Sequence, residues 1–410
     1  MFDLNLIGLI RVLRNIYGKG PADIEMIQKQ GLLAVKLGQI HALRVDFLDP
    51  EKCKQLAQLY RHTTSLPPES FNDLLDQYTD EDFRENFEYI EEEPFASASI
   101  GQVHRARLRT GEDVAIKLIK KDFTQSFKKD VRAVELFFRI LITFYPKLRR
   151  VANPLGILND IKTYTLSELD LRNELRGQDT LMGFYEDYKN VYDMSALRFI
   201  KMYRELSNEN LLVSEYVDGK TLDELLDEDE LDYSFLLNLF NVVGVYMFRV
   251  GTFHGDVHPG NIMVRNEDEM VFVDNGSLGY VEGKIKKGLF NFFDALCHYE
   301  FDKAANYLNE MSEKELEGND FEIYKREFLK LYEGFEDKTV SQISLTKQMM
   351  QTIKLGVNSG MEFEKGMFSV IRALMYLDGM VLRCNPEAVL MKDIKTFVDD
   401  FKKREEKLSQ

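Results

Sequence analysis

Two polar segments that flank short strands set the strongest limit on how this chain can fold. Asp256 and Asn261 stand five residues apart in His-Gly-Asp-Val-His-Pro-Gly-Asn, and Asp274 follows 13 residues after Asn261. The apolar run Val271–Val273 directly before Asp274 reads as a strand that ends at this aspartate. Carboxylate and amide oxygens are the hard ligands that Mg²⁺ prefers, so we predict that Asn261 and Asp274 bind this ion.

A lysine on a predicted strand lies far upstream of these segments. In Val114-Ala115-Ile116-Lys117, the side chains of Ala115 and Lys117 share one face of the strand. A small residue at Ala115 can cover an adenine ring while the lysine reaches phosphate oxygens. Taken alone, such a lysine is more often a solvated residue at the edge of a sheet, so the prediction depends on what surrounds it.

A loop of small residues precedes this strand. Residues 96–103, Ala-Ser-Ala-Ser-Ile-Gly-Gln-Val, have the frame of a glycine-rich phosphate-binding loop with alanine at the first two glycine positions. The Cβ atoms of Ala96 and Ala98 narrow the conformations of the loop, but its backbone amides can still approach phosphates. We expect the nucleotide to contact five loop residues: Ala96, Ser97, Ala98, Ser99 and Val103.

The order of these segments is typical of protein kinases, which transfer a phosphoryl group from ATP. In that arrangement Asp256 orients the attacking hydroxyl or accepts its proton. Asp274-Asn275-Gly276 has asparagine where kinases usually carry phenylalanine, which puts the packing role of that ring in doubt. The segment 213–219 resembles the connection between kinase lobes, where backbone groups of Glu215 and Val217 would bond adenine.

The change of hydrophobic period along the chain predicts an α+β, bilobal, protein-kinase-like fold. Residues 1–90 read as a helical extension, and strands at 99–108, 113–120, 198–202 and 211–216 place a small lobe at 91–217. A long helical region from 123 to 186 interrupts these strands. Residues 218–410 read as a helical lobe with short strands near 262–264 and 270–273.

Composition narrows the class of protein and its location. The formal net charge of -16 argues against nucleic-acid binding, which depends on cationic side chains. Three widely spaced cysteines, with no paired spacing, argue against a disulfide framework. We expect no apolar run long enough to span a membrane and no secretory leader, and therefore a cytoplasmic chain.

The first residues form an apolar stripe at helical spacing. This stripe either packs against another helix or lies on a membrane surface as a peripheral contact. Packing is the simpler interpretation. Its members are Phe2, Leu6, Leu9, Ile10, Leu13, Ile16 and Tyr17.

Lys36-Leu37-Gly38-Gln39 resembles the KxGQ motif of the UbiB (AarF-type) atypical kinases, and the alanine-containing loop is similar to theirs. The resemblance implies that a helical extension lays Lys36 and Gln39 over the active site. It also implies that Glu168 and Asp170 form the matching ExD motif near Lys36. Glu174 would then pair with Lys117 and hold the lysine toward the phosphates.

The resemblance implies an Mg-ATP-binding atypical kinase or ATPase that supports isoprenoid quinone biosynthesis or lipid handling. Its partners would be ATP and ADP, lipids or quinone-pathway intermediates, and biosynthetic proteins. Two alternatives stay open. One is a small-molecule phosphotransferase, because aminoglycoside and choline kinases carry a similar His-Gly-Asp-x-His-Pro-Gly-Asn string. The other is a non-catalytic scaffold that binds partners according to its nucleotide state.

Overall fold

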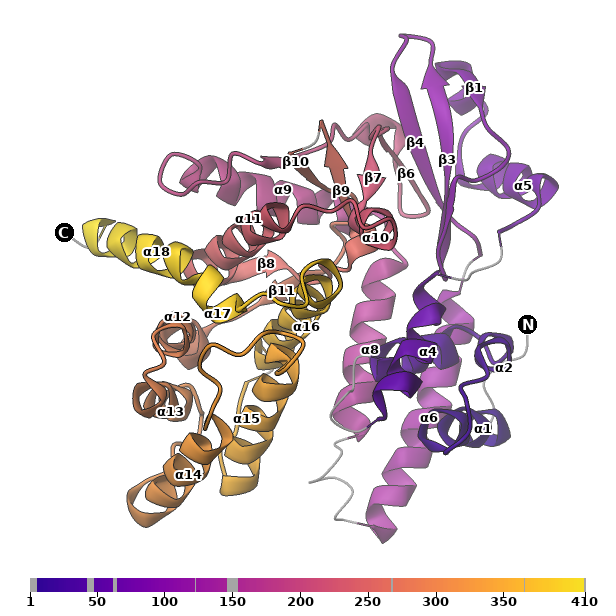
Figure 1. Ribbon diagram of the computed structural model, residues 1–410. Helices are drawn as coiled ribbons and strands as arrows, with labels where there is room; N and C mark the ends of the chain where they lie inside the picture. Colours follow the sequence, from indigo (N-terminus) through magenta and orange to yellow (C-terminus); the bar gives the residue numbers. More distant parts are fainter. Residues whose placement is uncertain are drawn as a thin grey trace. The chain divides into compact units, whose positions relative to one another are not determined.

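The computed structural model describes residues 6–42, 48–61, 65–121, 123–145, 154–266, 268–364 and 366–408 of the chain. The chain divides into two compact units (Figure 1). Unit 1 comprises Met1–Leu175 and Ile200–Tyr216, and unit 2 comprises Arg176–Phe199 and Val217–Gln410. The fold is α+β, as the sequence predicts. The three-part division at residues 90 and 217 stays a prediction.

Unit 1 contains a five-stranded antiparallel sheet in the order β1-β3-β4-β6, with β2 paired to β3. Its central strands form because apolar and polar residues alternate, so that every second side chain of β4 is buried. The predicted strands at 99–108 and 113–120 are present with slightly shorter bounds. The strands are β1 (Phe87–Ile90), β2 (Ala96–Ser97), β3 (Gly101–Leu108), β4 (Asp113–Ile119) and β6 (Leu211–Glu215).

The helices of unit 1 bury a second core beside this sheet. Helix α3 is buried on nearly every side, and Gly38 on α3 leaves no room for a side chain, because a Cβ there would lie 2.3 Å from Leu59 Cδ1. Gly31, with a φ of +95°, separates α2 from α3. The helices are α1 (Leu6–Tyr17), α2 (Ile24–Lys29), α3 (Leu32–Ala42), α4 (Pro50–Arg61), α5 (Pro68–Tyr78), α6 (Thr124–Phe144) and α8 (Pro154–Glu168).

The N-terminal apolar stripe is used for packing inside unit 1. Leu9 and Ile16 on α1 are 1% and 0% exposed and belong to the core that α1 shares with α3 and α6. Ile10 and Tyr17, which the sequence placed in the same stripe, are 43% and 57% exposed. Phe2 lies outside the described residues. The packing interpretation is therefore confirmed for the core members of the stripe.

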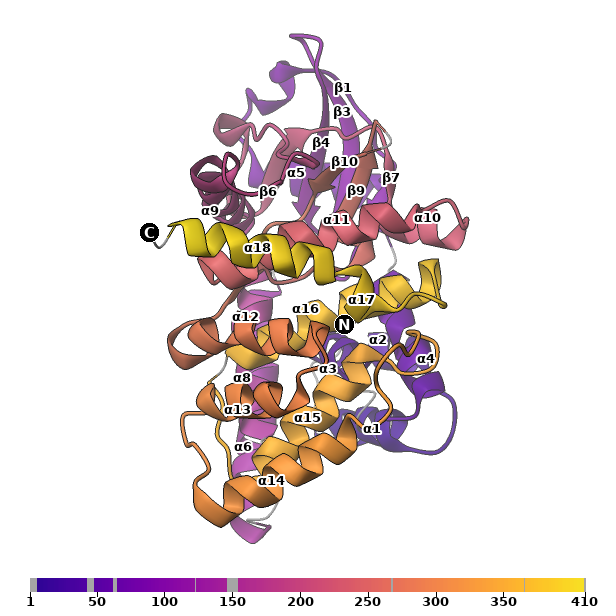
Figure 2. The same cartoon turned by 60° about the vertical axis from the view of Figure 1, so that its left-hand side comes forward.

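Unit 2 is mostly helical and holds two small sheets. One has the order β5-β10-β9-β7, and the other pairs β8 with β11 (Figure 2). Helix α9 (Arg172–Tyr188) begins in unit 1 and continues in unit 2. The strands are β5 (Leu197–Arg198), β7 (Lys220–Thr221), β8 (Thr252–His254), β9 (Ile262–Arg265), β10 (Glu269–Phe272) and β11 (Leu278–Tyr280).

Among the described residues of unit 2, nine further helices surround these strands, together with a π-helical turn at Val245–Val250 that continues α11. Short 3₁₀ turns occur at Phe83–Asn86 and Arg204–Leu206 in unit 1 and at Pro259–Asn261 in unit 2. The helices are α10 (Leu222–Asp227), α11 (Tyr233–Gly244), α12 (Gly283–Cys297), α13 (Phe301–Glu310), α14 (Gly318–Leu331), α15 (Leu345–Ser359), α16 (Gly366–Cys384), α17 (Leu390–Asp393) and α18 (Lys395–Leu408).

One stretch corrects the expectation that no run is long and apolar enough to cross a membrane. Tyr233–Val250 is long and apolar enough to cross a membrane by length and composition alone. Asn238 and Asn241 interrupt its apolar residues, so the stretch did not stand out in the sequence. Of this stretch, 56% is buried inside the structure, as in the core helix of a folded domain. The three cysteines are free, as the sequence predicts.

Candidate functional site

The predicted pair of Lys117 and Glu174 is present in unit 1. Lys117 projects from β4, and its Nζ lies 2.5 Å from Oε1 of Glu174, in the first turn of α9. Glu174 is only 4% exposed, so its negative charge requires a cation close by. The lysine side chain keeps 22% exposure. The arrangement therefore fixes one ammonium group at the surface of the sheet.

The small-residue loop forms a tight hairpin beside Lys117. Ala96 pairs with Val103 across β2 and β3, and Val103 in turn pairs with Lys117 on β4. The amide of Ala98 donates to the carbonyl oxygen of Gly101 at 2.8 Å, which closes the turn. Ser97 and Ser99 are half-buried, and Ala96 and Ala98 are exposed. Of the predicted loop residues, Ala96, Ser97 and Val103 thus lie on strands of the same sheet as Lys117, and Ala98 and Ser99 lie in the turn between β2 and β3.

Lys120 is a residue of this region that sequence reasoning missed. Its Nζ donates to the hydroxyl of Ser97 and to the carbonyl oxygen of Ala98, both at 2.7 Å. Burial lowers the pKa of Lys120 to about 8. The side chain therefore attaches the tip of the hairpin to the end of β4. The only signal in the sequence was a second lysine three residues after Lys117.

The predicted adenine-contacting strand is in place in unit 1. Ala115 on β4 pairs with Ser214 on β6, directly before Glu215. The N–H of Glu215 donates to the carbonyl oxygen of Lys201 at 2.8 Å. Of the backbone groups of Glu215, the carbonyl is therefore the better candidate for a base contact. Val217 is the first residue of the following segment of unit 2, and its contact with adenine stays a prediction.

The predicted catalytic and metal-binding side chains lie together in unit 2. Asn261 Nδ2 donates to the backbone oxygen of Asp256 at 3.1 Å and to its Oδ2 at 3.2 Å. The amide nitrogen of Asn261 thus faces Asp256, and its Oδ1 remains as the atom suited to a cation. The carboxylate Oδ1 of Asp274 accepts from the N–H of Gly276 at 3.2 Å, which fixes the turn after β10.

His254 joins the two aspartate segments. Its Nδ1 accepts from the N–H of Asp256 at 3.2 Å, so Nε2 carries the proton and donates to the backbone oxygen of Asp274 at 2.6 Å. Burial lowers the pKa of His254, in keeping with a neutral ring. The histidine is therefore structural. Because both its nitrogens bond backbone, it sets the spacing between Asp256 and Asp274.

Asn275, which replaces the usual phenylalanine, is buried and makes polar contacts. Its Nδ2 donates to the backbone oxygen of Phe272 at 3.2 Å and lies 3.5 Å from Oε1 of Gln178 on α9. Gly177, next to Gln178, allows this close approach, because a Cβ there would lie 1.9 Å from the backbone oxygen of Asn275. An aromatic packing contact is thus replaced by amide contacts to α9.

The KxGQ and ExD motifs meet in unit 1. Lys36 is 7% exposed, and its Nζ lies 2.5 Å from Oε2 of Glu168. Gln39 donates from Nε2 to the carbonyl oxygen of Leu59 at 3.0 Å. Asp170 accepts from the backbone N–H of Arg172 at 3.1 Å and forms an ion pair with its guanidinium, so it fixes the start of α9. The expected pairing of the two motifs is present between Lys36 and Glu168.

The structure thus gathers the predicted residues into two groups. Unit 1 holds the hairpin, Lys117, Glu174 and the paired motifs, and unit 2 holds Asp256, Asn261 and Asp274. The convergence of both groups on one nucleotide stays a prediction.

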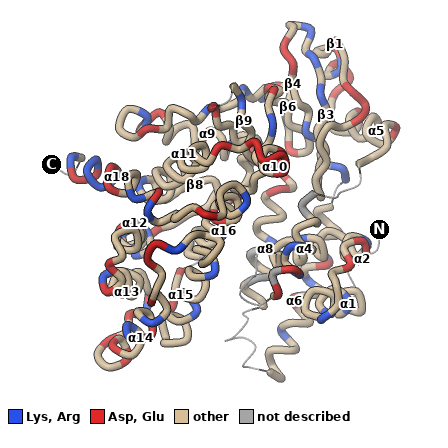
Figure 3. Tube along the Cα trace, in the orientation of Figure 1, with Lys and Arg blue, Asp and Glu red and all other residues tan. Residues whose placement is uncertain are grey.

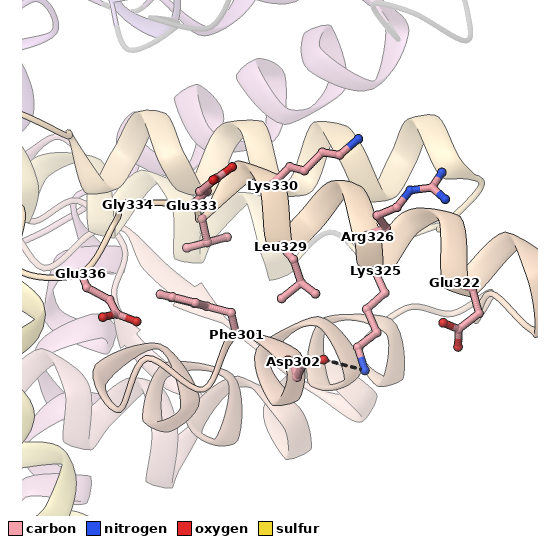
Figure 4. A pocket seen from close by; sticks show the side chains of 11 residues that line it. Phe301, Asp302, Glu322, Lys325, Arg326, Leu329, Lys330, Glu333, Gly334 and Glu336 are labelled. Atoms are coloured by element: carbon pink, nitrogen blue, oxygen red, sulfur yellow. Dashed lines mark ion pairs between the residues drawn. The ribbon is translucent and has the colours of Figure 1, made fainter.

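A surface hollow between α13 and α14 of unit 2 contains none of these residues (Figure 4). Side chains of both charge signs line it, and Lys325 Nζ forms an ion pair with Asp302 Oδ1 at 3.0 Å. We assign it no role in catalysis. Its lining residues are Phe301, Asp302, Glu322, Lys325, Arg326, Leu329, Lys330, Tyr332, Glu333, Gly334 and Glu336.

The chain is similar to curated bacterial proteins over most of its length. The probable protein kinase UbiB of Glaesserella parasuis is 25% identical over 408 residues, which cover 95% of this chain and 72% of that protein. The Vibrio cholerae protein of the same name is 24% identical over 383 residues, covering 91% and 69%. An uncharacterized protein from the hydrogenase 1 5′ region of Clostridium pasteurianum is 24% identical over 392 residues, covering 93% and 71%.

A solved structure supports the fold. The complex of Rv3197 with erythromycin from Mycobacterium tuberculosis aligns with a TM-score of 0.50 and 19% identity, over 92% of this chain and 95% of that one. At this identity the likeness concerns the fold alone. Residues 58–308, more than half of the chain, match the ABC1 atypical kinase-like domain. Together with the UbiB relatives, this match shows that the chain belongs to the UbiB/ABC1 family of atypical kinases.

Proposed function

We propose that this chain binds ATP with Mg²⁺ and acts as an atypical kinase or ATPase. The observation that carries the proposal is the ion pair between Lys117 and Glu174, with 2.5 Å between Nζ and Oε1, beside the hairpin of residues 96–103. A lysine held by a buried glutamate next to a tight hairpin turn is suited to bind phosphate oxygens.

The residues of unit 2 fit the remaining requirements of phosphoryl transfer. Asn261 offers its Oδ1 and Asp274 its carboxylate, which are the oxygen ligands that Mg²⁺ prefers. When bound, this ion would neutralise charge on the phosphates. Asp256 would orient an acceptor hydroxyl or water and take up its proton. Its carboxylate is held for this role by the hydrogen bond from Asn261.

The regulatory part of the proposal concerns the helical extension. Lys36, Gln39 and Glu168 are fixed by buried or half-buried contacts in unit 1, and we propose that this region restricts which acceptors reach the phosphates. Asp170 contributes by fixing the start of α9, the helix that carries Glu174. An acceptor in isoprenoid quinone biosynthesis or lipid handling, and a cytoplasmic location, rest on the family resemblance alone.

A nucleotide-titrated thermal unfolding series, with and without Mg²⁺, tests the proposal. We expect ATP to raise the unfolding temperature in an Mg²⁺-dependent way, and Asp274→Asn to remove the Mg²⁺ dependence. The matched control is Asp320→Asn, an exposed aspartate of α14 that should behave like the unaltered chain. The absence of any ATP-dependent shift in the unaltered chain would overturn the proposal.

ATP hydrolysis by the same variants distinguishes an enzyme from a scaffold. Turnover that is lost in Asp256→Asn and Asp274→Asn, and retained in Asp320→Asn, is expected for a kinase or ATPase. Nucleotide binding with equal background hydrolysis in all samples would favour the non-catalytic scaffold. Transfer to small hydroxylated metabolites without basal hydrolysis would favour the small-molecule phosphotransferase.

A further inference from the structure

Three side chains that can bind a metal ion meet where α12 and α18 of unit 2 pack together (Figure 2). Asp294 lies on α12, His298 directly follows this helix, and Asp399 lies on α18. One ligand atom from each residue lies within 4.8 Å of the other two. The cluster shares no residue with the candidate site for phosphoryl transfer, so the proposed function does not explain it.

The hydrogen bonding of His298 determines which ring nitrogen can bind a cation. Nδ1 lies 2.8 Å from the backbone oxygen of Asp294. A carbonyl oxygen only accepts, so Nδ1 carries the proton and Nε2 of the neutral ring has a lone pair. This Nε2 lies 3.1 Å from Oδ1 of Asp399. Two acceptor atoms at this distance require a positive charge between them, which is either a second ring proton or a metal ion.

The carboxylate of Asp294 distinguishes these two possibilities. Its Oδ2 accepts from Nζ of Lys402 at 2.7 Å. Its Oδ1 is buried and, within the described part of the chain, accepts no hydrogen bond, although Nδ1 of His298 lies 3.2 Å away. A second proton on His298 would satisfy Asp399 and leave this buried oxygen without a partner, which is unfavourable. A metal ion can bind both carboxylates and the ring at once.

The surroundings of the cluster are those of a metal site. A histidine that binds a metal usually donates its other ring N–H to a carbonyl or carboxylate oxygen, and the carboxylates that bind the metal are themselves hydrogen-bonded. Nδ1 of His298 and Oδ2 of Asp294 make these contacts. His298 also caps the C-terminal end of α12, where the helix dipole favours a cation. Figure 3 shows basic as well as acidic residues along α18, so the cluster is not part of a uniformly acidic helix.

We propose that Asp294, His298 and Asp399 bind a divalent transition-metal ion of the zinc class. Imidazole nitrogen and carboxylate oxygen are both ligands of Zn²⁺, and neighbouring ligands of a tetrahedral zinc ion lie about 3.4 Å apart. The contact between His298 and Asp399 is close to this value, and a bound ion would draw Asp294 nearer. The three side chains are 14%, 29% and 39% exposed in chain order, so a water can complete the site. The ion would join α18 to α12.

Calorimetric titration with Zn²⁺ tests the site. The chain is first treated with a chelator and then titrated in excess Mg²⁺ without nucleotide. We expect the unaltered chain to bind a single Zn²⁺ ion. His298→Ala and Asp399→Asn should each lower the affinity about 100-fold or more, because the loss of a hydrogen-bond partner of a metal ligand already costs about 10–100-fold.

The matched control is Asp400→Asn, which alters the neighbouring residue on α18. Its side chain is 55% exposed and forms an ion pair with Arg404. This variant should bind Zn²⁺ like the unaltered chain. Asp274→Asn should also retain Zn²⁺ binding, which separates this site from the proposed Mg²⁺ site. Loss of Zn²⁺ binding in Asp274→Asn but not in His298→Ala, or no binding by the unaltered chain, would overturn the proposal.

Thermal unfolding adds a readout that a purely structural cluster would not give. Zn²⁺ should raise the unfolding temperature of the unaltered chain and of Asp400→Asn, but not that of His298→Ala. If His298→Ala does not fold, Asp399→Asn carries the test, because its altered side chain is 39% exposed. A lower unfolding temperature of His298→Ala, combined with no effect of Zn²⁺ on the unaltered chain, would show a protonated histidine in place of the metal ion and overturn the proposal.

Discussion

The two groups of predicted site residues are held in place by different forces. In unit 1, Lys117 is positioned by a full charge pair with Glu174, whose carboxylate is buried. In unit 2, Asp256 and Asp274 are spaced by the neutral ring of His254 and by backbone contacts. The unit 1 group should therefore respond most to the removal of a charge. The unit 2 group should respond to changes in shape and hydrogen bonding.

The largest effect is expected from Glu174→Ala. This substitution leaves Lys117 without its buried partner, and breaking such a pair costs about 3 kcal/mol in the free energy of unfolding. Affinity for ATP should also fall, because the ammonium group is no longer fixed. Chemical denaturation and nucleotide titration measure the two effects. Glu174→Gln, which keeps the size of the side chain, separates charge from volume. If Glu174→Ala left the free energy of unfolding unchanged, the ion pair between Lys117 and Glu174 would not stabilise this part of the site.

A smaller effect is expected from Gly177→Ala in unit 2. The new Cβ would lie 1.9 Å from the backbone oxygen of Asn275, so the turn after Asp274 must shift, at a cost of about 1–3 kcal/mol. The matched control is Gly183→Ala on the same helix, where a Cβ meets nothing within 4 Å. That substitution should instead stabilise the chain by about 0.5–1 kcal/mol, because alanine favours helix over glycine. If both variants changed stability alike, α9 would not be in close contact with the Asp274 turn.

The effect that is smallest per step of the measurement concerns Lys120 and appears only as a slope of stability at alkaline pH. Its pKa in the folded chain is about 8, below the usual 10.5, so between these values the unfolded chain binds more protons. Stability should therefore rise with pH in this window, by at most about 1.4 kcal/mol per pH unit. Lys120→Met should remove this contribution to the slope. Identical slopes for Lys120→Met and the unaltered chain would contradict the lowered pKa of Lys120.

The family resemblance predicted the parts of the site that belong to a recurrent pattern. Lys117 and Glu174 are 57 residues apart, and Lys36 and Glu168 are farther apart still, yet both pairs were expected from the family resemblance and both are present. These residues occupy fixed places in known motifs, so their partners could be named without a structure. Lys120 and Gln178 have no such place. Their contacts arise from tertiary packing of the hairpin and of α9.

The apolar residues of α1 and α6 show why the tertiary packing could not be predicted from the sequence. Hydrophobic periodicity identifies the apolar face of a helix, but not which element covers it. Leu9 and Ile16 on α1 are buried, whereas Leu136 and Phe144 on α6 are exposed, although both helices are amphipathic. The break between α2 and α3 at Gly31 follows from a left-handed backbone conformation, which a single glycine in the sequence does not by itself reveal.

The central claim is that Lys117 and Asp274 act on the same nucleotide. A double-mutant cycle on Mg-ATP binding tests it most directly, with Lys117→Ala, Asp274→Asn and the combined variant measured by calorimetry. We predict that the losses of binding free energy are not additive, with a coupling of about 1 kcal/mol or more between the two positions. Strictly additive losses, or no loss in either single variant, would contradict the account.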